Sequence, residues 1–132
     1  MNILHYSLGL PPYRSGGLTK YATDLVQSQQ SKGDDVSLLF PGDYTFWKKP
    51  TMKIVQGASS FGIAVFELKN PTPVPLLHGV KNPSDIYKPS QKISNQDLEF
   101  FYNLIQPEVF HIHTLMGLPL ELVLFLKEKG VK

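Results

Sequence analysis

Apolar runs and amphipathic stretches alternate along this 132-residue chain. Residues 3–7 and 36–40 are short apolar runs bounded by polar or turn-forming residues, a pattern that predicts two buried strands. Between them, apolar side chains recur with a helical period from residue 18, and Lys32 and Gly33 are suited to end a helix. The expected apolar stripe is Leu18, Tyr21, Ala22, Leu25 and Val26, and the expected water-facing residues are Lys20, Thr23, Asp24 and Gln27. Strand, helix and strand in this order predict a βαβ unit with parallel strands.

The middle of the chain is less regular. After a predicted turn at residues 41–43, residues 52–56 and 62–68 are two short candidate strands, and the small residues between them predict a hairpin at the sheet edge. Residues 70–90 contain five prolines, which excludes a regular helix or an interior strand and predicts an extended loop. We therefore expect residues 41–93 to form an irregular insertion.

Regular alternation returns at residue 94. Ser94 and Asp97 have the spacing of a capping box, and the helix that they begin should end before Pro107. Residues 109–113 predict a fully buried strand, and residues 119–130 a further helix that is apolar nearly all round. This alternation predicts an α/β fold, a Rossmann-like open parallel sheet with helices on both faces. Ligands of such sheets bind at the carboxyl ends of the strands.

Composition narrows the function classes. The chain has 13 Lys plus Arg against 11 Asp plus Glu, a net charge of +2, which argues against a nucleic-acid binder. Cysteine is absent, which excludes disulfides and thiolate metal sites. The N-terminus lacks the basic residues of a signal peptide, and no apolar run approaches the ~20 residues that span a bilayer. We expect a cytoplasmic protein and leave open a peripheral contact at the inner membrane face.

The first candidate site follows the first strand. Gly16 and Gly17 let the backbone approach a ligand closely, and the helix behind them offers unpaired N–H groups. Arg14 adds a fork of donors, so the loop suits a diphosphate or a carboxylate. A glycine turn that caps the helix and binds nothing explains the same residues equally well.

The second candidate site follows the last strand. His111 and His113 share one strand face, and His113 lies at the carboxyl end, where an imidazole is suited to act as an acid, a base or a hydrogen-bond donor. For His111 we expect a structural role. A metal site needs a third ligand, and no carboxylate or cysteine lies nearby in sequence, so none is expected. His5 and His78 have no partner that the sequence identifies.

Three stretches, residues 12–18, 70–83 and 107–119, together resemble the N-terminal domain of family 4 glycosyltransferases, retaining enzymes of GT-B architecture. The glycine loop lies in the first stretch. The proline-rich second stretch resembles a subgroup associated with bacterial surface polysaccharides in the cell envelope. The third, which contains His-Ile-His-Thr and ends at Pro119, is the most specific.

The resemblance implies a hexosyltransferase that moves a sugar from a nucleotide-sugar donor to a polysaccharide or lipid-linked acceptor. It implies that Gly16 and Gly17, with Arg14, meet the donor diphosphate, and that His113 is the catalytic residue beside the transferring sugar. It also implies substrate contacts by the residues Tyr13, Thr114 and Gly117. Neither an obligatory metal nor another cofactor is implied.

The sequence departs from the family pattern in its extent. The family's second, donor-binding domain carries a basic pair and two glutamates seven residues apart, and we do not find that domain here. We therefore expect residues 1–132 to be a partial N-terminal domain, the truncated first half of a GT-B fold, inactive alone. Residues 109–113 should then form an exposed sheet edge, and residues 120–126 should be partly uncovered.

Two other hypotheses stay open. The chain is alternatively a stand-alone, non-catalytic Rossmann-like module that binds a ligand or a partner and complements a separate donor-domain chain. An in-frame continuation of the gene with the paired glutamates favours the glycosyltransferase, whereas a stop codon before a separate donor-domain gene favours the module. A metal-dependent hydrolase built on His111 and His113 is the third hypothesis, and it fails if chelation changes neither stability nor ligand binding.

Overall fold

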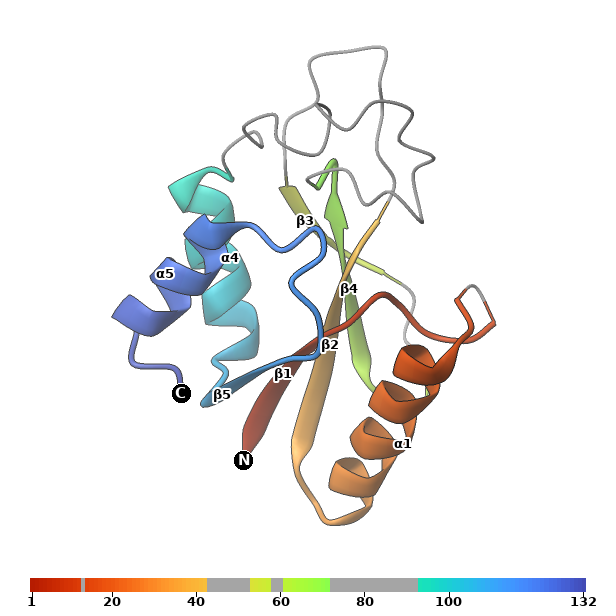
Figure 1. Cartoon of the computed structure of the whole chain (residues 1–132). Helices are drawn as coiled ribbons and strands as arrows, with labels where there is room; N and C mark the ends of the chain where they lie inside the picture. Colours follow the sequence, from red (N-terminus) through yellow and green to blue (C-terminus); the bar gives the residue numbers. More distant parts are fainter. Residues whose placement is uncertain (13, 43–52, 58–60, 72–92) are drawn as a thin grey trace, which may run out of the picture.

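The protein is described by a computed structural model over residues 1–12, 14–42, 53–57, 61–71 and 93–132. Its elements in chain order are β1 (Asn2–Tyr6), α1 (Gly17–Ser31), β2 (Asp35–Pro41), β3 (Lys53–Gln56), β4 (Ala64–Lys69), α4 (Asn95–Ile105), β5 (Val109–Ile112) and α5 (Leu120–Glu128) (Figure 1). One five-stranded sheet runs in the order β3-β4-β2-β1-β5. All pairs are parallel except β3 with β4, which is antiparallel. The predicted α/β class with an open, mostly parallel sheet is confirmed.

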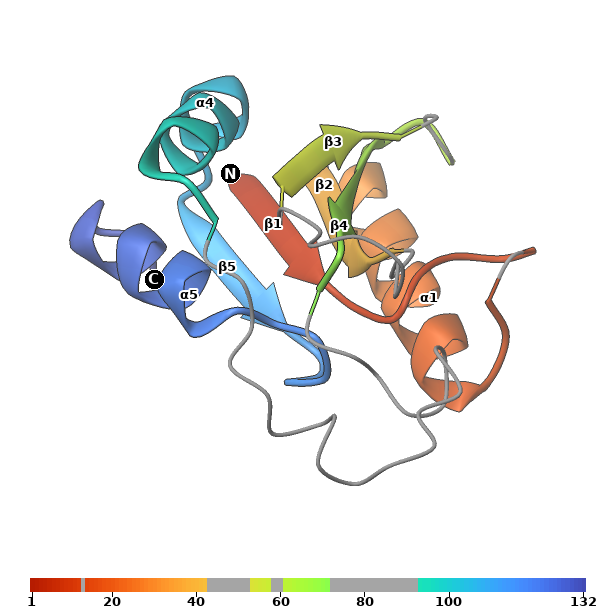
Figure 2. The same cartoon turned by 90° about the horizontal axis from the view of Figure 1, so that it is seen from above.

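Helices cover both faces of the sheet. Figure 2 shows α1 on one face and α4 with α5 on the other. Side chains of β1 alternate between them, because successive strand residues point to opposite faces. Leu4 and Tyr6 belong to the apolar cluster beneath α4 and α5, whereas His5 bonds to Gln29 of α1. A second cluster includes Val26 of α1 and joins it to β2 and β4.

The buried side of α1 differs from the predicted stripe. Its buried residues are Thr19, Ala22, Thr23 and Val26, while Tyr21 is 58% exposed. The prediction that Thr23 faces water is wrong. Its hydroxyl donates to the carbonyl of Thr19 at 2.8 Å, so burial leaves no polar group unsatisfied.

Two sequence predictions for α4 and α5 agree with the structure. The hydroxyl of Ser94 accepts a hydrogen bond from the backbone N–H of Asp97 at 3.1 Å, which confirms the predicted N-cap. In α5, Leu122 and Leu126 are fully buried, whereas Leu120 is 66% exposed. The partial exposure expected for residues 120–126 is therefore confirmed.

The prediction of a fully buried strand at residues 109–113 is wrong. Every residue of β5 is only partly buried, because β5 lies at the edge of the sheet beside β1. The expected edge position is confirmed, but the C-terminal residue covers part of that edge. On the outer side of β5, the N–H of Phe110 donates to the carbonyl of Lys132, and the N–H of Lys132 donates to the carbonyl of Glu108.

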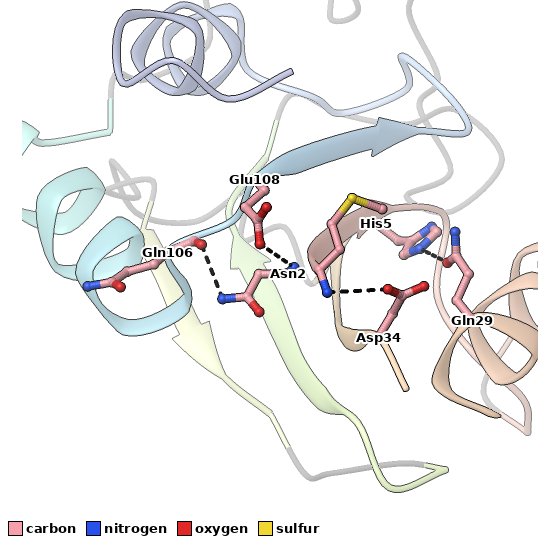
Figure 3. A network of polar contacts seen from close by, with 7 residues as sticks. Asn2, His5, Gln29, Asp34, Gln106 and Glu108 are labelled. Carbon is pink, nitrogen blue, oxygen red and sulfur yellow. Dashed lines mark hydrogen bonds and ion pairs between the residues drawn. The ribbon is translucent and has the colours of Figure 1, made fainter. Parts of the chain in front are cut away.

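Polar contacts at the start of β1 hold it between its neighbours (Figure 3). The N–H of Asn2 donates to the Glu108 carboxylate at 3.0 Å, and the terminal amino group pairs with Asp34 at 3.3 Å. These contacts join β1 to the segment before β5 and to the turn after α1. They help to fix a register in which His5 lies opposite His111.

Some expectations fall on residues that the structure leaves undescribed. The antiparallel pairing of β3 and β4 is that of a hairpin, but residues 58–60 lie outside the described ranges. So do Asp43 of the expected turn and residues 72–92 of the expected proline-rich loop. Within the described ranges, no helix has the length and apolar character needed to cross a membrane.

Candidate functional site

The candidate site lies at the carboxyl ends of β1 and β5, beside α1. The chain leaves β1 at Tyr6 and returns as α1 at Gly17, and β5 ends at Ile112 immediately before His113. Figure 1 shows the loop from β1 to α1 and the loop from β5 to α5 at the same end of the sheet. This is where the parallel-sheet rule places a ligand.

A groove of about 350 Å³ follows the loop before α1. Arg14, Ser15 and Gly16 line one part of it, and the first two turns of α1 supply polar side chains. Those side chains belong to Thr19, Lys20, Thr23 and Asp24. Two of the predicted ligand-binding residues, Arg14 and Gly16, therefore share one concave surface.

The backbone at Gly16 has a conformation suited to glycine. Its φ of 122° and ψ of 168° lie in a region that side chains rarely enter, and a Cβ built there would meet nothing within 4 Å. Gly17 is the first residue of α1, and its own Cβ position is equally open. No acidic side chain stands in the first turn of α1, so the positive end of the helix dipole meets no carboxylate of that turn.

Arg14 lies against the start of the same loop. A Cβ at Gly9 would stand 2.6 Å from Cγ of Arg14, so Gly9 must remain glycine for the arginine stem to pack there. The N–H of Arg14 donates to the carbonyl of Leu10 at 3.1 Å. These contacts shape the loop that presents Gly16.

Three histidines meet between β1, β5 and α1. His5 is fully buried, while His111 and His113 are partly buried. The rings of His111 and His113 stack with centroids 4.4 Å apart, and each centroid is 5.1 Å from that of His5. Nδ1 of His5 lies 2.8 Å from Nε2 of His113, a hydrogen bond between two imidazoles. We call these three residues the histidine cluster.

Two residues of α1 contact the histidine cluster. Oε1 of Gln29 lies 2.7 Å from Nε2 of His5 and accepts a hydrogen bond from that N–H (Figure 3). The ring of Tyr21 packs edge-on against His113, with centroids 5.8 Å apart. Tyr21 and Gln29 are eight residues apart, about two helical turns. The same side of α1 therefore contacts the histidine cluster at both positions.

Burial favours the uncharged form of two members of the histidine cluster, His113 and His5. Burial, followed by repulsion from His111 and His5, lowers the pKa of His113 from 6.5 to about 4. Burial also lowers the pKa of His5, an effect that the bond to Gln29 opposes and His111 reinforces. His113 is therefore placed to exchange hydrogen bonds as an uncharged imidazole.

Thr114 and Gly117 form the loop that follows β5. The hydroxyl of Thr114 accepts from the N–H of Met116 at 3.2 Å, and Gly117 has a φ of 71°. The Tyr6 hydroxyl donates to the carbonyl of Met116 at 2.8 Å, which ties this loop to β1. Burial raises the pKa of Tyr6, so that hydroxyl keeps its proton.

The structure thus divides the predicted residues into three groups. Arg14 and Gly16 line the groove, His113 belongs to the histidine cluster beneath α1, and Thr114 and Gly117 shape the loop after β5. The described residues that line the groove do not include His113. Tyr13 lies outside the described residues.

Sequence reasoning missed His5 and Gln29. It left His5 without a partner, and it found no third ligand beside His111 and His113. A signal was present, because β1 and the last strand are neighbours in a Rossmann-like order and both carry a histidine near the carboxyl end. For Gln29 the sequence gives no signal beyond its position in the last turn of α1. His111, expected to be a core residue, is partly exposed and stacks on His113.

Among solved structures, this chain is similar to a glycosyltransferase domain. The catalytic domain of starch synthase IV from Arabidopsis thaliana, bound to ADP and acarbose, aligns with a TM-score of 0.47 and 17% sequence identity. The alignment covers 98% of this chain and 31% of that one, so this chain spans less than a third of its length. No protein-family model matches the sequence, and no curated protein matches it.

Proposed function

We propose that this chain is the acceptor-side, Rossmann-like part of a retaining GT-B glycosyltransferase that takes its sugar from a nucleotide-sugar donor. The proposal includes the finer assignment made from sequence, a family 4 type hexosyltransferase of surface-polysaccharide synthesis with a polysaccharide or lipid-linked acceptor. One observation carries it: the open N-terminus of α1 and His113 lie at the same end of the sheet, beside one helix.

In this proposal the N-terminus of α1 receives the donor diphosphate. The N–H groups of a helix start bind anions, and the conformation of Gly16 leaves the backbone uncovered by any side chain of its own. Arg14 lines the groove and adds positive charge near that end, whereas Lys20 is paired there with Asp24 at 2.8 Å. The diphosphate would be bound by backbone groups and Arg14 together.

His113 is assigned to the transferring sugar. Its Nε2 is occupied by His5, so the role falls to Nδ1 and the ring edge. Because its low pKa keeps the imidazole uncharged, His113 would position hydroxyl groups by hydrogen bonding and would not act as a cation. Thr114 and Gly117 would shape the acceptor side through the loop after β5.

A nucleotide titration tests the diphosphate site. UDP and ADP should bind residues 1–132 weakly, since in this proposal they form only the acceptor-side half of the enzyme. Gly16→Ala should weaken this binding further. Gly33→Ala is the matched control, because Gly33 also has a positive φ, 91°, and open space, but lies at the other end of α1. Equal binding by the two variants would contradict the diphosphate assignment.

A transfer assay tests the expectation that the chain is only half of an enzyme. Residues 1–132 alone should transfer no sugar from a panel of nucleotide sugars to lipid-linked acceptors. Measurable transfer would contradict the proposed division of labour between two domains. A gene that continues in frame with the paired glutamates would support it.

A further inference from the structure

The histidine cluster has the donor set of a metal site. One ring nitrogen from each of His5, His111 and His113 lies within 4.8 Å of the other two, and His5 and His111 stand opposite each other on the paired strands β1 and β5. We propose that these three histidines bind a late first-row divalent cation, Zn²⁺ above all, and leave at least one coordination position to water or an anion.

The geometry needs only side-chain movement. Zinc binds imidazole nitrogen at about 2.0–2.1 Å, so three nitrogens around a tetrahedral ion stand roughly 3.3 Å apart. The 2.8 Å pair of His5 and His113 must open slightly, and wider separations must close. His111 and His113 are partly exposed, so their rings can turn from the stacked arrangement toward a shared ion.

The backbone already places the donors. His5 and His111 are register partners on adjacent parallel strands, and His113 follows two residues later on the same face. Their separation is therefore fixed by strand pairing on the β1–β5 edge. A site on paired strands keeps its donors together without a ligand.

Gln29 supplies the outer support that histidine ligands usually have. Its Oε1 accepts a hydrogen bond from the N–H at His5 Nε2 at 2.7 Å, which fixes the tautomer and directs the Nδ1 lone pair into the cluster. Without a metal, that lone pair accepts a hydrogen bond from the proton on His113 Nε2. A cation would take the place of this proton between the two rings, and the proton would move to Nδ1 of His113 as that ring changes tautomer, so the imidazole stays neutral.

The chemistry of the donors selects the ion. Three neutral imidazoles suit zinc, nickel or copper, whereas magnesium and calcium require oxygen ligands. Burial favours the uncharged form of His5 and His113, so metal binding at neutral pH displaces few protons. The inference stands apart from the proposed glycosyltransferase function, because none of its observations involves a sugar or a nucleotide.

The test is a zinc titration of the full 132-residue chain without an affinity tag, against a chromophoric chelator. We expect one Zn²⁺ per chain, a rise in Tm with zinc, and no response to Mg²⁺. Gln29→Leu should weaken zinc binding about 10–100-fold, as losses of outer hydrogen bonds to metal ligands do. His111→Asn and His113→Asn should weaken it further. His78→Asn, which also removes one of the four histidines, should leave it unchanged.

A spectroscopic measurement keeps the proposal testable if a variant fails to fold. X-ray absorption of the zinc-loaded natural chain should show three imidazole ligands. No zinc binding, unchanged affinity in both His111→Asn and His113→Asn, equal binding of Mg²⁺, or a zinc shell made of oxygen atoms would each overturn the proposal.

Discussion

The two faces of the sheet are packed with different side chains. Beneath α4 and α5, β1 contributes Leu4 and Tyr6 to a cluster of apolar residues. Toward α1, the same strand contributes His5, which is as fully buried as Leu4. Burying a polar group costs stability unless it is hydrogen-bonded, and apolar residues would fill the space more favourably. The α1 face therefore combines its apolar cluster with a buried, hydrogen-bonded histidine, and the proposed function uses that side of the sheet.

Substitutions at the adjacent residues Leu4 and His5 of β1 test the difference between the two sheet faces most directly. Leu4→Ala should lower the free energy of unfolding by about 2–5 kcal/mol, because it opens a cavity in a close-packed apolar cluster. Urea unfolding measures the loss. A loss below ~1 kcal/mol would mean that the α4 and α5 face is not the main source of stability.

The glycine loop should be sensitive at one position and tolerant at the next. Gly16→Ala should destabilise by about 1–3 kcal/mol, because a side chain strains the backbone at φ 122°. Gly17→Ala should be neutral or slightly stabilising, since Gly17 is already helical and alanine favours helix. Thermal unfolding of the two variants decides this, and equal losses would contradict the observed start of α1.

Acid should weaken the α1 face. In chelator-treated protein, the unfolded chain binds a proton at His113 near pH 6.5, whereas the folded chain resists until about pH 4. Stability from this residue is complete above pH 6.5 and is lost as the pH falls toward 4. As the pH is lowered across this range, the midpoint of urea unfolding should fall less steeply in His113→Asn than in the natural chain. Identical slopes in the two proteins would refute the low pKa.

Among the buried residues of β1, the smaller effect on stability should come from His5→Leu. The variant loses two hydrogen bonds, but His113 and Gln29 are partly exposed and can bond to water, and leucine fills most of the space. The free energy of unfolding should change by about 1 kcal/mol or less. A loss as large as that of Leu4→Ala would show that the histidine is structural and would remove the contrast between the faces.

The sequence predicted most of the fold because its patterns are local. The helical period after residue 18, the cap at Ser94 and the glycines that end helices each depend on a few neighbouring residues. It failed where burial depends on distant partners. Thr23 is buried because a backbone carbonyl one turn earlier satisfies it, and β5 is partly exposed because it lies at the sheet edge.

The candidate site was predictable only in part. The sequence located Gly16 and His113, because glycines before a helix and a histidine after a strand are visible in one stretch of chain. It did not predict the contact between His5 and His113, which are 108 residues apart. That contact depends on which strands pair and in which register. Gln29 was missed for the same reason, since its role depends on which side of α1 faces β1.

The most direct test of the proposed function is residue-level NMR of the labelled chain titrated with UDP. We predict that the backbone amides of Gly16 and Gly17 and the His113 ring shift together along one binding curve, while α4 and α5 residues such as Leu98 and Leu122 stay unchanged. Shifts confined to the α4 and α5 face, or none at saturating nucleotide, would contradict the account.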